Sequence, residues 1–345
     1  MEIYTNRVAE NWTSYILKND FGMEVHVLNY GGIITKILVP DREGNLENVV
    51  LGYKNVKDYE KDTNFLGAVI GRVAGRIKHA GFELNGQSYD LEANDGPHHL
   101  HGGSYGLNQV VWDSELFEEE GGAGVKLHHM SKDGEGGYPG EVQIELFYTL
   151  TNNNEFIIDY RANTNHTTPL TLTNHSYFNL SGNLKETIEN HQVRMDSHHF
   201  LELDEDLIPT GTILDVENTP FDFRSGRKLK DGMSSTHPQN DIAGNGYDHY
   251  YIYDKGLAQK VKVKDEQSGR VLSIQTDQPG MVMYTSNNLA EGLQLAEGTS
   301  KKHLGVCFET QASPASLHET GLPSVLLHPH QNYEKRTVFQ FGLDK

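Results

Sequence analysis

Apolar and polar residues alternate with a period of two along much of the chain. In residues 141–162, EVQIELFYTLTNNNEFIIDYRA, every second position from Val142 to Leu150 is apolar or aromatic, and the pattern resumes from Phe156 to Tyr160. Asn152, Asn153 and Asn154, between the two runs, are typical of a turn. Because successive strand residues face opposite sides of a sheet, this stretch predicts an antiparallel hairpin.

The same pattern recurs in residues 260–276, KVKVKDEQSGRVLSIQT, and in residues 23–44, MEVHVLNYGGIITKILVPDREG. Helical periodicity is scarce, and the best candidate is a short helical turn around residues 55–61. The 35 glycines against 11 prolines suit many tight turns. These features predict an all-β fold, a large antiparallel β-sandwich. No repeat or low-complexity linker divides the chain, so we expect a single domain over residues 1–345.

The composition of the chain limits the kinds of molecule it can bind and the cellular compartment in which it is expected. The formal net charge of −19 should repel nucleic acid and anionic lipid, and it argues against a strongly anionic substrate. Cys307 is the single cysteine, so no disulfide can form within the chain and a reducing compartment is expected. The start of the chain, MEIYTNRVAENW, lacks the apolar core of a signal peptide. We therefore expect a cytoplasmic protein with no membrane partner, either a monomer or a homodimer.

The stretch TPLTLTNHSYFNLSG, residues 168–182, is typical of a strand that carries a histidine among hydrogen-bonding groups. With a period of two, His175 shares a face with threonines, a tyrosine and an asparagine. Such a face would suit a polyhydroxylated ligand. A surface histidine, or one with only structural hydrogen bonds, would produce the same pattern.

Three histidines lie close together in NDGPHHLHGG, residues 94–103. His99 and His101 could bind a metal, because alternate residues of a strand place two imidazoles on one side. No carboxylate or cysteine stands at a familiar ligand spacing, and the following glycines suit a loop. The segment could equally contact a ligand or lie on the surface.

Glu309 lies in GVCFETQASP, residues 305–314, where apolar residues surround it. Burying a carboxylate there is costly unless the group is paired or has a task, so either a functional glutamate or an exposed strand edge fits. Cys307 has no feature that would make it a nucleophile.

Two further stretches carry charged candidates. GRVAGRI, residues 71–77, is no phosphate loop because its glycine spacing matches neither known pattern. Its Arg76 could hydrogen-bond neighbouring hydroxyls or form a surface ion pair. GYDHYY, residues 246–251, places Asp248 in an aromatic loop and is weak evidence alone.

Taken together, these stretches resemble the aldose 1-epimerase family. The matching pieces appear in the family's order and run from about residue 71 to 311: GRVAGRI, GPHHLHGG, DGEGGYPG, TNHSYFNLSG, LIPTG, TPFDFR, GYDHYY, QPGMVMYTSN and GVCFETQ. The resemblance implies a β-sandwich with an open cleft for a free aldose, and anomer interconversion without metal or cofactor. It implies His175 as general acid and Glu309 as general base. His101 would lie near the ring oxygen, while Arg76 and Asp248 would bind sugar hydroxyls.

Two positions depart from the family pattern. Gly75 stands where many members have asparagine, and Val282 stands where some have glutamine. Both changes remove a polar side chain and leave the sugar preference open. The alternatives are a sugar-binding or sensor protein without turnover, a hexose-phosphate epimerase, and a metal-dependent enzyme that uses His99 and His101.

Overall fold

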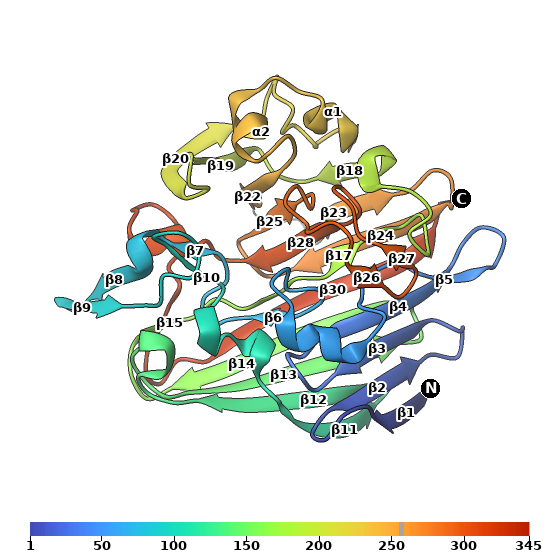
Figure 1. The fold of residues 1–345 in the computed structure, drawn as a ribbon, viewed down its shortest axis with the longest axis horizontal. Helices are drawn as coiled ribbons and strands as arrows, with labels where there is room; N and C mark the ends of the chain where they lie inside the picture. Colours follow the sequence, from blue (N-terminus) through green and yellow to red (C-terminus); the bar gives the residue numbers. More distant parts are fainter. Residues whose placement is uncertain (255–258, 345) are drawn as a thin grey trace.

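The computed structural model describes residues 1–254 and 259–344. Its largest sheet has nine antiparallel strands in the order β11-β12-β13-β14-β30-β24-β23-β18-β21 (Figure 1). In that order the strands are Asp113–Glu119, Gly122–Ser131, Val142–Thr151, Glu155–Thr164, Tyr333–Leu343, Arg270–Thr276, Gln259–Lys264, Gln192–Met195 and Arg227–Lys228.

Two smaller antiparallel sheets accompany it. A five-stranded sheet contains β1 to β5 in chain order, namely Glu2–Arg7, Thr13–Lys18, Glu24–Leu28, Ile34–Pro40 and Leu46–Asn48. A six-stranded sheet has the order β17-β28-β25-β22-β19-β20, namely Tyr177–Phe178, Val306–Gln311, Gly280–Tyr284, Asp248–Ile252, His199–Leu203 and Pro209–Asp215. Side chains of all three sheets share one buried core, so the predicted antiparallel β-sandwich is confirmed.

The predicted local elements are present. β13 pairs with β14 across residues 152–154, β23 with β24, and β3 with β4. The expected helical turn is the 3₁₀-helix η1, Val56–Lys61, whose first turn is capped by the side chain of Asn55. The α-helices among the described residues are α1, Lys230–Met233, and α2, Pro238–Ile242, and neither is long and apolar enough to cross a membrane. The single domain over residues 1–345 stays a prediction.

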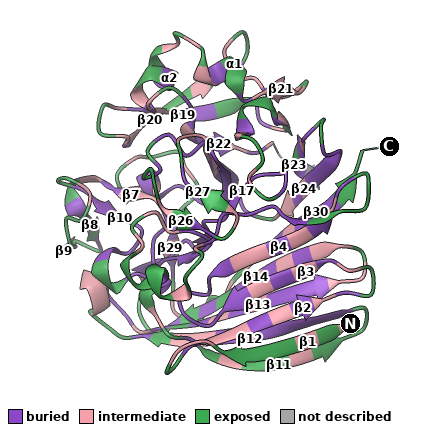
Figure 2. Cartoon of the chain, turned by 45° about the vertical axis from the view of Figure 1, so that its right-hand side comes forward, coloured by how far each residue is buried: buried purple, intermediate pink, exposed green. Residues whose placement is uncertain are grey.

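Burial follows the period-two pattern along the long strands (Figure 2). In β13 the fully buried residues Val142, Ile144, Leu146, Tyr148 and Leu150 alternate with more exposed ones. The buried side chains face the core, where removal of apolar area from water stabilises the fold. β1 and β11, at the sheet edges, are largely exposed (Figure 2).

Leu146→Ala should lower the free energy of unfolding by about 2–5 kcal/mol, because it leaves a cavity between neighbouring strands. Leu146 is 0 % exposed and lies opposite Leu127 and Tyr160. Urea unfolding followed by circular dichroism measures the change. The matched control is Leu116→Ala on the edge strand β11, where Leu116 is 50 % exposed and the expected loss is within about 0.5 kcal/mol.

The prediction of one strand over residues 168–182 is wrong. The segment forms three two-residue strands in three sheets: β15, Thr168–Pro169, pairs with β29, Leu326–Leu327; β16, Thr173–Asn174, pairs with β6, Val69–Ile70; and β17 pairs with β28. Both predicted faces are buried, and the side-chain oxygens of Asn174 and Asn179 accept hydrogen bonds from the backbone N–H groups two residues further on. Alternation alone could not reveal this, because each piece is paired by a segment distant in the sequence.

Candidate active site

A cleft of about 190 Å³ lies over the six-stranded sheet. All five predicted site residues line it: Arg76, His101, His175, Asp248 and Glu309. The remaining wall is partly aromatic and apolar, formed by residues that include Phe65, Tyr177, Leu203, Tyr250, Val282 and Tyr284. A small polar ligand with apolar C–H faces suits such a wall.

Part of the cleft wall is formed by residues that lie opposite one another on neighbouring strands of this sheet. Glu309 in β28 lies opposite Val282 in β25, which lies opposite Tyr250 in β22. Two residues along, Tyr284 lies opposite Asp248. Because side chains alternate between the two faces of a sheet, these residues point to the same side. Phe308, the residue before Glu309, points to the other side and joins the core. Glu309 is thus on a central strand and is 3 % exposed, which excludes the exposed-edge interpretation.

Arg76 and His101 are brought together by a short strand pair. β7, Arg76–Ile77, pairs with β10, His99–Leu100, and His101 follows directly. The Gly75 N–H donates to His101 Nδ1 at 3.0 Å, and the His101 N–H donates to the Gly75 carbonyl at 3.2 Å. His101 has φ 57°, and Gly102 after it has φ 90°, with the Gly71 carbonyl oxygen overlapping the place that a Cβ would take. Position 102 therefore accepts only glycine without displacing this loop.

His175 follows β16 and is held by its backbone. Its N–H donates to the Ala68 carbonyl at 2.9 Å, and its carbonyl accepts from the Gly67 N–H at 3.0 Å. The residue is 4 % exposed, so the surface interpretation of this histidine is excluded.

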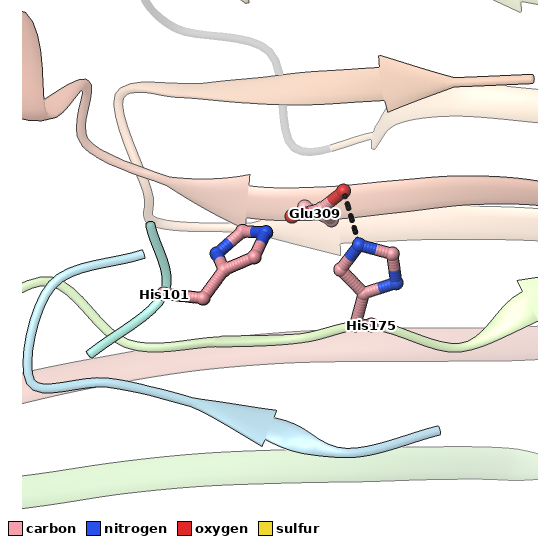
Figure 3. Close-up of side chains that lie close together, drawn as sticks. All are labelled: His101, His175 and Glu309. Carbon is pink, nitrogen blue, oxygen red and sulfur yellow. Dashed lines mark ion pairs between the residues drawn. The ribbon is translucent and has the colours of Figure 1, made fainter. Parts of the chain in front are cut away.

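The two predicted proton-transfer groups are in contact. His175 Nε2 lies 3.4 Å from Glu309 Oε1, as Figure 3 shows with His101 beside them. The Phe65 and His101 rings pack in a T-shaped arrangement, with their centroids 4.7 Å apart. No pattern in the sequence marked Phe65 as part of the cleft, whereas Tyr284 could have been found by alternation from Val282.

The charged side of the cleft contains Arg76, which pairs with two aspartates. Arg76 Nη1 lies 3.7 Å from Asp248 Oδ2, and Arg76 Nε donates to Asp95 Oδ2 at 2.7 Å. Arg76 is the sole lysine or arginine among the described residues that line the cleft. A phosphate would therefore meet one cation that is already paired.

Burial sets the protonation behaviour of the central groups. It lowers the pKa of His175 to about 4, and it raises the pKa of Glu309 well above its usual value, with the negative charge of Asp248 adding to that rise. It also lowers the pKa of His101, helped by His175 and Arg76. Desolvation disfavours the charged form of each group, so the histidines favour the neutral ring and Glu309 favours the acid.

Spacing alone would allow a metal at this place. One ligand atom each of His101, His175 and Glu309 lie within 4.8 Å of one another. However, His101 Nδ1 accepts the Gly75 N–H, so a neutral ring carries its proton on Nε2 and offers the cleft a donor rather than a lone pair. We therefore assign no metal to these residues.

The alternative in which His99 and His101 bind a metal together is not supported by their positions. The His99 ring turns away from the cleft and its Nδ1 lies 2.7 Å from the Glu92 carbonyl, while His98 Nδ1 accepts from the His79 N–H. Cys307 is fully buried behind the cleft, and burial raises the pKa of its thiol well above the usual value. It is therefore no activated nucleophile.

Gly75 and Val282, which depart from the family pattern, both line the cleft. Gly75 has φ 89°, and a Cβ there would lie 3.0 Å from Pro314 Cγ. A side chain at position 75 would press on Pro314, so glycine fits this wall. Val282 presents an apolar surface between Tyr250 and Glu309.

Comparison with known proteins places the chain in a family. The family profile described as Aldose 1-epimerase matches residues 13–340, and the chain belongs to this family. It is 39 % identical over 325 residues to the galactose mutarotase of Bos taurus, covering 93 % of this chain and 92 % of the relative. It is 29 % identical over 330 residues to the maltose epimerase of Levilactobacillus brevis, covering 95 % and 94 %. The crystal structure of galactose 1-epimerase from Lactobacillus acidophilus NCFM superposes with a TM-score of 0.88 at 29 % identity, covering 100 % of this chain and 99 % of that one.

Proposed function

We propose that this protein interconverts the α and β anomers of free aldoses of the galactose and glucose type, with His175 as general acid and Glu309 as general base. The observation that carries the proposal is the 3.4 Å approach of His175 Nε2 to Glu309 Oε1 inside a cleft lined by polar and aromatic side chains. The family and its galactose mutarotase and maltose epimerase relatives support the reaction.

The reaction moves two protons and needs no redox step. Glu309 takes the proton of the anomeric hydroxyl while His175 gives one to the ring oxygen, and the bond between C1 and the ring oxygen breaks to leave the open-chain aldehyde. Rotation about C1–C2 presents the other carbonyl face. Reclosure reverses the two transfers and yields the other anomer. Each positioned acid or base contributes typically about 10²–10⁴ in rate.

The burial of His175 and Glu309 favours the proton transfers of ring opening. Before the step, His175 is protonated and Glu309 is ionised; after it, both are neutral. Because burial lowers the pKa of His175 and raises that of Glu309, the neutral pair is the favoured state of the cleft. The charged pair gains from attraction across 3.4 Å, which keeps it accessible for the next cycle. His175 and Glu309 together carry one proton before and after the step, so the same two groups can catalyse both ring opening and ring closure.

The other predicted residues have binding roles in this proposal. His101 presents its Nε2–H to the substrate near the ring oxygen, because its Nδ1 is held by the Gly75 N–H. Arg76 and Asp248 bind sugar hydroxyls, one as a donor and the other as an acceptor.

Polarimetry tests the function directly. Freshly dissolved α-D-galactose, α-D-glucose and maltose are followed to their equilibrium rotation with and without the protein. We expect faster mutarotation for at least one of them. Binding without acceleration would favour a sugar sensor, and no effect on any of the three would contradict the proposal for this set of sugars.

Asp248→Ala should raise KM for galactose roughly ten- to hundredfold while kcat changes little. A hydrogen bond to a charged group contributes about 1.5–3 kcal/mol, and this contact is made equally in the ground and transition states. Arg76→Ala should act in the same direction. Initial rates of mutarotation over a range of galactose concentrations separate the two constants.

Asp159→Ala is the matched control, because Asp159 also pairs with an arginine, Arg336, but lies outside the cleft. Its KM should equal that of the wild type. If Asp248→Ala abolished kcat and left KM unchanged, Asp248 would belong to the proton-transfer machinery instead.

We also propose that the protein acts in the cytoplasm, without nucleic-acid or membrane partners, as a monomer or homodimer. The net charge of −19 and the single cysteine support this setting. Size-exclusion chromatography with light scattering measures the oligomeric state.

A further inference from the structure

The loop before β6 places an aromatic ring against both histidines of the cleft. The centroid of the Phe65 ring lies 4.7 Å from that of His101 and 5.8 Å from that of His175. The two imidazoles stand at 86° to each other with centroids 5.5 Å apart, as the pair in Figure 3 shows. Phe65 is half-buried and lines the cleft, whereas His101 is 7 % and His175 4 % exposed. The phenyl ring thus covers part of both imidazoles against the water of the cleft.

The backbone of Phe65 is held in an unusual conformation. Its φ is 57°, in a region that bulky residues rarely adopt and that persists only where surrounding contacts fix it. Here the Asp62 carboxylate accepts the Asn64 N–H at 2.8 Å and the Leu66 N–H at 2.7 Å. The Tyr177 hydroxyl donates to the Asn64 carbonyl at 2.8 Å. The chain is therefore fixed on both sides of Phe65.

The same loop also holds the backbone of His175. The Gly67 N–H donates to the His175 carbonyl, and the His175 N–H donates to the Ala68 carbonyl. Residues 62–68 thus fix the main chain of the predicted general acid and cover its side chain. An apolar wall for a sugar would need neither the contact with both imidazoles nor the backbone bonds to His175.

We propose that Phe65 is a positioning residue whose ring keeps the His101 and His175 imidazoles in place and shields them from water. Asp62 in turn fixes the loop that presents this ring. Water around His175 would stabilise its charged form, so the ring would release its proton less readily to the sugar. The alternative is that Phe65 serves only as a wall of the cleft.

Nitrogen-15 NMR of histidine-labelled protein over a range of pH tests the shielding. The signals are assigned by their loss in His101→Asn and His175→Asn. Burial lowers the pKa of both rings, to about 4 for His175. Phe65→Ala should raise both pKa values toward the ordinary value of histidine, because water then reaches the rings. Phe65→Tyr, which keeps the ring, should stay close to the wild type. Unchanged pKa values in Phe65→Ala would overturn the proposal.

The surrounding charges do not account for such a rise. The titratable and charged groups that face the two imidazoles, all retained in Phe65→Ala, are Arg76, His99, Tyr177, Tyr284, Cys307 and Glu309. Asp62→Asn, which weakens the bonds to the loop, should also raise the two pKa values, though by less than Phe65→Ala. Loss of the negative charge of Asp62 would by itself lower them. Lower values in Asp62→Asn would therefore contradict its role in holding the loop.

The kinetic readout rests on the proposed function, whereas the NMR readout does not. Phe65→Ala should lower kcat roughly tenfold or more, since small displacements of reacting groups are costly, and Phe65→Tyr should retain most of the rate. A raised KM with unchanged kcat in Phe65→Ala would show that Phe65 is only a wall, and would overturn the proposal. Absence of mutarotation by the wild type would instead contradict the proposed function and leave the NMR result standing.

Two matched variants control for loss of stability. Phe117→Ala removes a half-buried aromatic ring from the edge strand β11, outside the cleft. Asp41→Asn changes a carboxylate that likewise accepts two backbone N–H groups, those of Glu43 and Asn45 at 2.9 Å. Both should leave kcat and the histidine pKa values unchanged. If Phe65→Ala does not fold, Phe65→Gly takes its place, because glycine adopts φ 57° without strain.

Discussion

Glu309→Gln should lower kcat for mutarotation of α-D-galactose by at least about 10². Glutamine has nearly the size of glutamate and can still accept a hydrogen bond, but it cannot take the proton of the anomeric hydroxyl. The folded protein should lose no stability, because burial raises the pKa of Glu309 and thus opposes its charge. Polarimetry measures the rate, and a thermal melt confirms the fold.

Glu145→Gln provides the same chemical change outside the cleft, where Glu145 pairs with Lys126 across β12 and β13. It should behave as the wild type. A near-wild-type rate for Glu309→Gln would remove Glu309 from the role of general base.

His175→Asn should also lower kcat by at least about 10², because asparagine cannot donate a proton to the ring oxygen. The loss should persist across the pH range, because asparagine does not titrate. His166→Asn, an exposed histidine outside the cleft, is the matched control and should leave the rate unchanged.

The double variant Glu309→Gln/His175→Asn gives a sharper result. Because the two groups serve one proton exchange, their losses should not multiply, and the double variant should be about as slow as the slower single one. Multiplying losses would show that the two residues act independently, in conflict with the 3.4 Å pair.

The alternation of apolar residues is sufficient to predict the long strands and much of the core. Residues 142–150 fall within β13 and residues 156–160 within β14, because a period of two places the apolar side chains on one side of a sheet, where burial stabilises them. The same rule failed for residues 168–182. There the asparagine side chains accept hydrogen bonds from backbone N–H groups two residues further on, and segments distant in the sequence supply the strand partners.

The sequence by itself thus determined the all-β class, the hairpins and, through the family motifs, the five residues of the candidate site. Only the tertiary structure decided which interpretation of each residue holds. Glu309 is buried on a central strand, His99 turns away while His101 enters the cleft, and Phe65 and Cys307 contact the two histidines. The reason is physical: these contacts depend on the register and packing of segments far apart in the chain, and no local pattern encodes where such segments meet.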